Sequence, residues 1–181
     1  MKVKTPIIET ERLQLVPLGI NHLSSVYVNW MNDPEVNAYL ESGGDYTLDK
    51  LNEFLLNVEK SSILFWAIHI KENGKHIGNI KIDPINFRHK YGEYGIMMGE
   101  KKEWGKGYAK EASLSVIMYC FSKDIDLRKV NLGVRSNNES AVQLYKKLGF
   151  TVEGVYKKHV ITKLGYDDIL RMALFNPIYE Q

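Results

Sequence analysis

A glycine-rich turn separates a short apolar run from a long helix-compatible run in the middle of this chain. Residues 104–109 read Trp-Gly-Lys-Gly-Tyr-Ala, the apolar residues 95–98 precede them, and a helical pattern extends over residues 108–122. A strand that turns directly into a helix leaves the first N–H groups of that helix without intrahelical partners, and their partial positive charge points into the turn. The segment therefore predicts a strand, a turn suited to a phosphate group and a helix in succession.

The chemistry of the turn supports this interpretation but leaves an alternative open. Its two glycines lack Cβ atoms, so a ligand's oxygens can approach the backbone, and Lys106 adds a positive charge. The alternative is a tight turn without a ligand, because a single Gly-x-Gly is a weak motif. The Gly-x4-Gly-Lys-Ser/Thr phosphate loop is absent, and Lys110 stands at the third glycine position of the dinucleotide-binding fingerprint. Those two nucleotide-binding folds are therefore set aside.

Length and composition limit the class of protein. At 181 residues, we expect a single domain over residues 1–181. A hydrophobic fraction of 44% and a charged fraction of 25% are typical of a globular protein, and a net charge of +2 argues against nucleic acid as the main partner. No apolar run approaches the length of a membrane span, and no secretory segment follows Met1–Lys4, so we expect no membrane partner and a cytoplasmic location.

Cysteine and histidine usage narrows the chemistry further. The single Cys120 excludes an internal disulfide framework and lies on the apolar face of the helix after the turn, which predicts a core residue rather than a nucleophile. The histidines form no pair at metal-ligand spacing, so we expect no metal site. The five histidines are His22, His69, His76, His89 and His159.

Hydrophobic periodicity predicts a mixed α/β chain without linkers or repeats. The expected strands cover residues 12–16, 64–70, 76–82, 93–98, 129–134, 150–155 and 169–174. The expected helices cover residues 21–31, a segment that begins at Asp33-Pro34, residues 48–58 after a Thr47 cap, residues 108–122, and residues 141–148 closed by Gly149. Asn73-Gly74 is a strong hairpin signal between the second and third strands. This order predicts one central sheet with helices on both sides.

Two segments together resemble the GCN5-related N-acetyltransferase (GNAT) superfamily. Residues 104–109 resemble its acetyl-CoA pyrophosphate loop, Gln/Arg-x-x-Gly-x-Gly/Ala, although Trp104 stands where the wider superfamily has Gln or Arg. Residues 138–150 resemble its Asn-x-x-Ala-x-x-Leu-Tyr-x-Lys-x-Gly-Phe segment. The opening residues and the end of the chain are similar to the branch of ribosomal-protein alanine, spermidine and amino-sugar N-acetyltransferases. The resemblance implies a mostly antiparallel, splayed α+β sheet of six to seven strands flanked by helices on both faces.

The resemblance also implies an activity and a coenzyme site. It implies an acetyl-CoA-dependent N-acetyltransferase in which a primary amine attacks the thioester directly, with backbone groups of the strand before the turn bound to the pantetheine arm. Asn138 is implied to pair with an amide of that arm, although asparagine is also a common helix N-cap. The implied coenzyme-binding residues are Met97, Met98, Gly99, Trp104, Gly105, Lys106, Gly107, Tyr108, Ala109, Lys110 and Asn138.

Two residues are the catalytic candidates under this resemblance. Tyr145 lies two helical turns after Asn138, and a phenol with a pKa of about 10 can donate a proton to a departing thiolate with a pKa of about 8.5. Its alternative role is a core residue. Glu93 is the candidate base, whereas its alternative is a solvated charge paired to Arg88 or Lys90, with ordered water as the base.

The acceptor is less constrained than the coenzyme. Trp30, Glu35 and Tyr39 lie in the region that the resemblance assigns to the acceptor pocket, although Glu35 could serve only to offset a helix dipole. The chain looks similar to enzymes that act on nucleotide-linked amino sugars, while a peptide N-terminus and a polyamine stay open. Residues 42–49 are not conspicuously acidic, which argues against a polyamine. A non-catalytic acetyl-CoA-binding module is the alternative function, and the oligomeric state, a homodimer included, also stays open.

Overall fold

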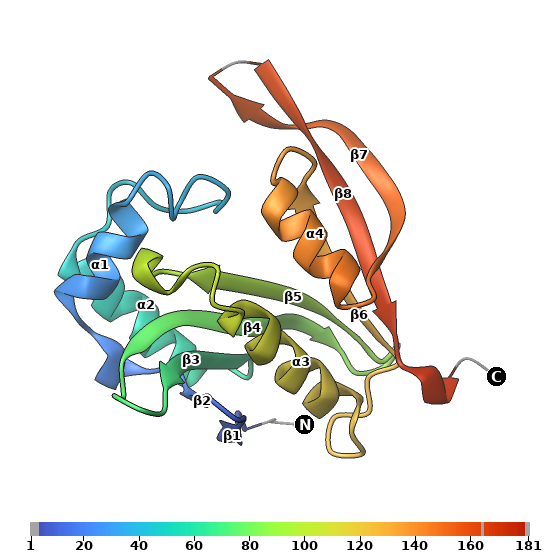
Figure 1. Cartoon of the computed structure of the whole chain (residues 1–181), viewed down its shortest axis with the longest axis horizontal. Coiled ribbons are helices and arrows are strands. Elements are labelled where there is room, and N and C mark those ends of the chain that lie inside the picture. Colours follow the sequence, from blue (N-terminus) through green and yellow to red (C-terminus); the bar gives the residue numbers. More distant parts are fainter. Residues whose placement is uncertain (1–3, 164, 180–181) are drawn as a thin grey trace. The chain divides into compact units, whose positions relative to one another are not determined.

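The computed structural model describes residues 4–163 and 165–179, and its elements appear in Figure 1. The strands are β1 (Ile8–Glu9), β2 (Leu13–Pro17), β3 (Leu64–Ile70), β4 (His76–Asn86), β5 (Tyr91–Met98), β6 (Lys129–Arg135), β7 (Thr151–Thr162) and β8 (Gly165–Phe175). The α-helices are α1 (Ser25–Asn32), α2 (Leu48–Lys60), α3 (Tyr108–Phe121) and α4 (Glu139–Lys147), with 3-10 turns η1 (Ile20–His22), η2 (Lys101–Glu103) and η3 (Pro177–Tyr179). None of the helices in the described ranges is both long and apolar enough to span a lipid bilayer.

The strands form one eight-stranded sheet in the order β1-β2-β3-β4-β5-β6-β8-β7 (Figure 1). The pairs β1–β2, β2–β3, β3–β4, β6–β8 and β7–β8 are antiparallel, while β5 and β6 are parallel. The registered pairing of β5 with β6 covers only Tyr91–Glu93, a short match for two long strands. The predicted mixed α+β, mostly antiparallel sheet is confirmed, and the two-residue β1 raises the number of strands above the six or seven expected.

The chain divides into two compact units. Unit 1 contains the stretch up to Asp83 together with Gly95–Val116, and unit 2 contains Pro84–Tyr94 together with the stretch from Ile117 onward. Strands β4 and β5 and helix α3 each contribute residues to both units. The expectation of one domain over residues 1–181 stays a prediction.

In unit 1, helices α1 and α2 bury an apolar face as the sequence predicts. Thr47 caps α2 by accepting a hydrogen bond from the Lys50 N–H, and Leu51 and Leu55 are fully buried. Leu48, predicted on the same face, is 49% exposed because it lies in the first helical turn, beyond the edge of the core. The cluster around these leucines includes Tyr27, Trp30 and Met31 of α1 and Ala67 of β3.

The prediction of a helix beginning at Asp33-Pro34 is wrong. Asp33 Oδ1 does accept N–H hydrogen bonds from the next turn, as a cap would, but residues 33–47 form only turns and bends. The Asn37 side-chain amide and the Gly44 N–H both donate to the Met31 carbonyl at 2.9 Å, which folds this segment back onto the end of α1. Gly44 has a φ of +88°, a left-handed conformation that a continuing helix does not contain.

Three of the five histidines lie together in unit 1, which their sequence spacing did not indicate. The ring centroids of His22, His69 and His76 lie 5.0–5.4 Å apart, and the Nε2 atoms of His22 and His69 are 3.2 Å apart. Desolvation lowers the pKa of His76 to about 4, so this imidazole is neutral at physiological pH. The described residues include no group of three His, Cys, Asp or Glu side chains arranged to hold a metal ion.

Unit 2 contains a long hairpin that the sequence predicts only in part. The expected strands 150–155 and 169–174 overlap the first half of β7 and the second half of β8. In the structure β7 continues to Thr162, and β8 begins at Gly165. The register shifts between Tyr156 and Val160, where β7 carries extra residues relative to β8. A bulge of this kind interrupts the two-residue alternation on which strand prediction depends.

Candidate active site

The glycine turn has a backbone open to a ligand. Gly105 and Gly107 have φ values of +76° and +84°, so both occupy the left-handed region that favours glycine. No atom lies within 4 Å of the position that a Cβ of Gly105 would take, and at Gly107 only the Arg12 side chain does, at 3.5 Å. Helix α3 begins at Tyr108, directly after the second glycine, as predicted.

The first amides of α3 have no hydrogen-bond acceptor in the described part of the chain. Among the described residues, no acceptor takes a hydrogen bond from the N–H groups of Tyr108, Ala109 or Lys110. The first N–H of the helix that has a backbone acceptor is that of Glu111, which donates to the Gly107 carbonyl at 3.1 Å. A row of free amides at a helix N-terminus behind two glycines fits the oxygens of a diphosphate. Lys106 Nζ forms an ion pair with Glu103 at 2.7 Å, so its charge is shared.

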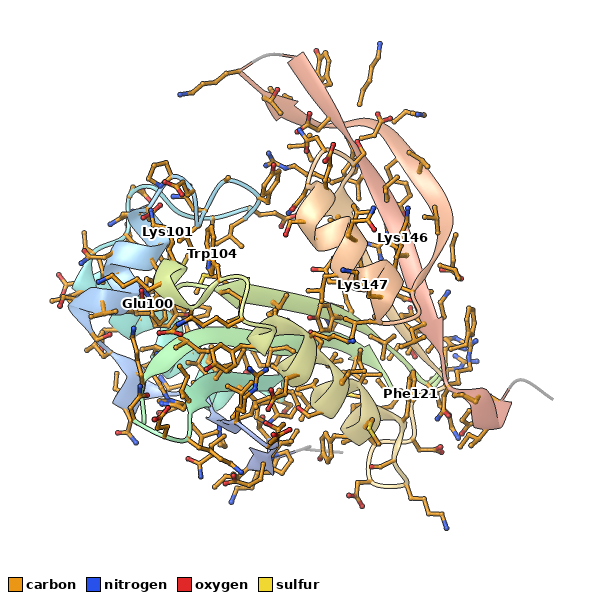
Figure 2. All side chains as sticks on the ribbon, in the orientation of Figure 1. Glu100, Lys101, Trp104, Phe121, Lys146 and Lys147 are labelled. Atoms are coloured by element: carbon orange, nitrogen blue, oxygen red, sulfur yellow. The ribbon has the colours of Figure 1, made fainter. Side chains whose placement is uncertain are left out.

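Trp104 connects the turn to the end of β5. Its indole N–H donates to the Met98 carbonyl at 2.8 Å, while the side chain stays 42% exposed. Figure 2 shows Glu100, Lys101 and Trp104 on the segment between β5 and α3. Because this hydrogen bond fixes the carbonyl at the end of β5, Trp104 contributes to the backbone geometry on which the implied pantetheine contacts depend.

Trp30 lies inside unit 1 rather than on its surface. The side chain is buried, and its ring lies so close to Gly99 that a Cβ on this glycine would approach the Trp30 ring to 2.1 Å. The Gly99 N–H donates to the Ile77 carbonyl of β4 at 2.9 Å. Trp30 therefore supports the backbone at the end of β5, and only a glycine at position 99 leaves room for the ring.

In unit 2, Asn138 is the N-cap of α4. Its Oδ1 accepts a hydrogen bond from the Ala141 N–H at 3.2 Å, which is the alternative role considered from the sequence. Its Nδ2 has no hydrogen-bond acceptor within residues 4–163 and 165–179. The same side chain can therefore cap the helix through its oxygen and donate to a ligand carbonyl through its nitrogen.

Tyr145 is buried and protonated at neutral pH. The side chain is 8% exposed, and its ring lies 5.8 Å from that of Tyr94 and 5.9 Å from that of Phe150. Desolvation raises the pKa of Tyr145 to about 12, since an apolar environment disfavours the phenolate. The phenol proton is thus present throughout the physiological range. Figure 2 labels the next two residues of α4, Lys146 and Lys147.

Glu93 is held by an arginine that the sequence did not identify. Its two carboxylate oxygens accept hydrogen bonds from the two terminal nitrogens of Arg171, each at 2.7 Å, whereas the sequence suggested Arg88 or Lys90. Arg171 lies opposite Gly133 in the β6–β8 ladder, and a Cβ on Gly133 would come within 2.8 Å of the guanidinium. The bond to Glu93 is the main cause that raises the pKa of Arg171.

The acidic residues before the acceptor region are partly neutralised. Lys101 Nζ lies 2.7 Å from Asp33 Oδ2 and 3.3 Å from Glu35 Oε1. The hydrogen bond from Lys101 is the largest cause that lowers the pKa of Asp33. Tyr39 and Glu35 are both exposed, so they can meet a ligand from solvent.

Cys120 confirms the prediction of a core residue. Its side chain is fully buried in α3, and desolvation raises the pKa of its thiol to about 12. A protonated thiol without solvent access is a poor nucleophile. This cysteine therefore contributes packing and no covalent chemistry.

Arg12, Glu111 and Arg171 are the residues beside the site that sequence reasoning missed. Arg12 and Glu111 meet across 99 positions, and Arg171 meets Glu93 across 78. Arg12 belongs to the opening residues that resemble the GNAT branch, but the sequence assigned it no role. No local pattern predicts contacts of this range.

Comparison with known proteins places these features in context. Residues 12–151 match the sequence model of a family described as "Acetyltransferase (GNAT) domain". The chain is 31% identical over 174 residues to FsC-acetyl coenzyme A-N(2)-transacetylase of Aspergillus fumigatus. The aligned region covers 90% of this chain and 73% of the fungal protein. It is 32% identical over 107 residues to spermidine N(1)-acetyltransferase of Escherichia coli (strain K12), which covers 59% of this chain and 56% of that protein.

A solved structure shares the fold. The chain resembles the crystal structure of spermidine N-acetyltransferase from Vibrio cholerae in complex with CoA and spermine, with a TM-score of 0.83 and 24% identity. The match covers 95% of this chain and all of the Vibrio chain. At this level of identity the likeness concerns the fold alone.

Proposed function

Because this chain belongs to the acetyltransferase (GNAT) family and is an N-acetyltransferase, we propose that its acetyl donor is acetyl-CoA and its acceptor a primary amine. The observation that carries the proposal is the row of free amides from Tyr108 to Lys110 behind Gly105 and Gly107. These amides offer hydrogen bonds and positive dipole ends to a diphosphate without a covalent bond to the protein. The amine then attacks the thioester directly, because no described side chain is an activated nucleophile of the cysteine type.

The rest of the coenzyme is assigned to backbone and amide groups. We assign the pantetheine arm to the backbone at Met97, Met98 and Gly99, where Trp104 and Trp30 hold the chain in place. An N–H near Met98 would polarise the thioester carbonyl as charge develops on its oxygen. Asn138 would donate its Nδ2–H to a carbonyl of the arm, which leaves its capping bond intact.

Tyr145 is proposed as the acid. A neutral phenol would stabilise the developing thiolate by donating a hydrogen bond to it. Full transfer from a phenol with a pKa of about 12 to a thiol with a pKa of about 8.5 is uphill, by roughly 5 kcal/mol. The phenol therefore acts mainly as a hydrogen-bond donor in the transition state, and the departed thiolate takes its proton from solvent.

Of the two bases left open by the sequence, the geometry favours ordered water. Both oxygens of Glu93 already accept hydrogen bonds from Arg171, so taking a proton would require this pair to break. We expect Glu93→Gln to lower kcat/KM by less than about tenfold, because a general base contributes roughly 10²- to 10⁴-fold. The pH profile of kcat/KM should keep its shape.

The control for this variant is another paired glutamate of unit 2. Glu153 forms an ion pair with Lys129 at 2.7 Å, so Glu153→Gln removes a comparable surface pair and should leave the rate unchanged. Loss of the ascending limb of the profile in Glu93→Gln alone would identify Glu93 as the base.

For the acceptor, we favour a polyamine over the amino sugar first suggested by the sequence. Residues 33–49, which are the segment between α1 and α2 together with the first two residues of α2, contain five carboxylates and no Lys or Arg. Ion pairs engage Asp33, Glu35 and Asp45, whereas Glu41 and Asp49 have no ion-pair partner in the described chain. Such a segment attracts a multiply charged cation. Two of the relatives reported above are spermidine acetyltransferases, which agrees with this choice.

The experiment is a thiol-release assay with acetyl-CoA against spermidine, spermine, amino sugars, nucleotide-linked amino sugars and peptides with free N-termini. We expect saturable thiol release with a polyamine, and a KM for the polyamine that rises with ionic strength because salt screens exposed carboxylates. Release with an amino sugar or a peptide alone would replace the polyamine by that acceptor. Tight coenzyme binding without release on any amine would favour the non-catalytic acetyl-CoA-binding module.

A further inference from the structure

A single arginine directly before β2 contacts the glycine turn and the first turn of α3, all within unit 1. Arg12 Nε and Nη2 both lie 2.7 Å from Glu111 Oε2, and the Arg12 backbone N–H donates to Glu111 Oε1 at 2.8 Å. Arg12 Nη1 donates to the Lys106 carbonyl at 3.0 Å, and the guanidinium lies 4.5 Å from the centroid of the Tyr108 ring. Arg12 thus contacts the turn, the first residue of the helix and a carboxylate one turn further on.

Glu111 anchors this arrangement. Its side chain is 18% exposed, and Oε1 also accepts a hydrogen bond from the Thr10 hydroxyl at 2.6 Å. Burial alone would raise the pKa of Glu111, but the hydrogen bonds from Thr10 and Arg12 outweigh it and lower the pKa. The carboxylate is therefore ionised at neutral pH and holds Arg12 in one place.

The hydrogen bond from Arg12 to the Lys106 carbonyl fixes the orientation of the whole Lys106–Gly107 peptide unit. The Lys106 C=O and the Gly107 N–H belong to one planar trans peptide unit, in which the two groups point in opposite directions. Since the Lys106 carbonyl faces Arg12, the Gly107 N–H faces away from it. Gly107 has a φ of +84°, and glycine in a turn is free to rotate this peptide unless something holds it.

Arg12 also removes an electrostatic conflict. A carboxylate one turn into α3 would repel an anion bound at the start of that helix, because like charges that are partly buried are poorly screened. The guanidinium neutralises Glu111 at the place where the carboxylate is nearest to the turn. The positive potential at the amides of the turn is then not reduced by the Glu111 carboxylate.

We infer that Arg12 is a positioning residue for the coenzyme diphosphate, which it orients through the Lys106–Gly107 peptide and the ion pair with Glu111. This inference rests on the proposed function, since it assumes that the turn binds acetyl-CoA. Arg12 acts through the backbone of the turn, and its guanidinium is already occupied by protein groups. Lysine cannot replace it, because an ammonium lacks the planar fork that reaches a carboxylate and a carbonyl together.

The test compares donors that share the acetylated pantetheine arm and differ in the phosphates and nucleoside attached to it. The variants are Arg12→Met, Arg12→Lys and Glu111→Gln, and the donors are acetyl-CoA, acetyl-dephospho-CoA and S-acetylpantetheine, which has the thioester but no diphosphate. We expect KM to rise roughly tenfold for acetyl-CoA and for acetyl-dephospho-CoA, with kcat little changed, as the loss of one charge-assisted hydrogen bond predicts. The kcat/KM for S-acetylpantetheine should match that of the wild type.

The outcomes separate the possible errors. An equal loss with all three donors would overturn the inference in favour of a purely structural role for Arg12. A loss with acetyl-CoA that disappears with acetyl-dephospho-CoA would also overturn it, because Arg12 would then contact the 3′-phosphate directly. Lys129→Met, which breaks the ion pair with Glu153 in unit 2, is the matched control and should change no constant.

Direct binding distinguishes this inference from the proposed function. In calorimetry with desulfo-CoA, a wild type that saturates while the Arg12 variants bind with equal affinity would overturn only the role of Arg12. A wild type that does not bind would overturn the proposed function and, with it, the inference. If Arg12→Met fails to fold, Glu111→Gln still decides, because it keeps the volume of the side chain and removes the charge that holds Arg12.

Discussion

Tyr145→Phe is expected to lower kcat by roughly 10²-fold or more while leaving the KM for acetyl-CoA nearly unchanged, because a general acid acts in the transition state. The phenyl ring keeps the packing of Tyr145 against Tyr94 and Phe150, so only the hydroxyl is lost. Steady-state kinetics with saturating amine measures the change. A loss below threefold or so would remove Tyr145 as the acid, since acid catalysis contributes at least about 10²-fold.

The pH profile gives a second test of the same residue. Because burial raises the pKa of Tyr145 to about 12, the phenol stays protonated as pH rises past 10, where an exposed tyrosine ionises. Wild-type kcat should therefore show no descending limb from this group below pH 10. Tyr166→Phe, at an exposed tyrosine of β8, is the control and should match the wild type in rate and thermal stability.

Gly107→Ala should raise the KM for acetyl-CoA by roughly 10- to 100-fold, which corresponds to the loss of one or two charge-assisted hydrogen bonds. A Cβ at this position would stand beside amides that we assign to the diphosphate, and an alanine there has a φ of +84° to maintain. That conformation costs an L-residue about 1–2 kcal/mol, so the free energy of unfolding should also fall.

Gly74→Ala separates the two effects of Gly107→Ala. Gly74, in the turn between β3 and β4, has a φ of +67°, and nothing lies within 4 Å of its Cβ position. The Gly74→Ala variant should lose a similar amount of stability in thermal unfolding, with no change in the KM for acetyl-CoA. Equal KM values for both variants and the wild type would contradict a diphosphate site in the turn.

The sequence predicted those parts of the fold that depend on neighbouring residues. The alternation and the Asn73-Gly74 turn predicted the β3–β4 hairpin, in which the Gly74 N–H donates to the Ile70 carbonyl at 2.8 Å. Thr47 and Gly149 predicted the start of α2 and the end of α4, because capping depends on backbone geometry within a few residues. The glycine turn and α3 were predicted for the same reason.

What the sequence did not predict depends on distant contacts. The segment after Asp33 has a helix start signal, but hydrogen bonds to the Met31 carbonyl hold it in turns. The partner of Glu93 was assigned to a nearby residue, although Arg171 reaches it from β8 across Gly133. Both outcomes were decided by tertiary packing, which local propensity does not contain. The roles of the individual site residues stay predictions until the variants above are measured.

Because Cys120 is buried, its reaction with a thiol reagent reports unfolding of the protein. It is the chain's only cysteine, it is closed to solvent inside α3, and the raised pKa of its thiol keeps it protonated in the native state. An aromatic disulfide reagent added to native enzyme should therefore detect thiols from the coenzyme alone. In denaturant, the same reagent should count one sulfhydryl per unfolded molecule. Without denaturant and coenzyme, the rate at which it labels Cys120 measures how often α3 opens.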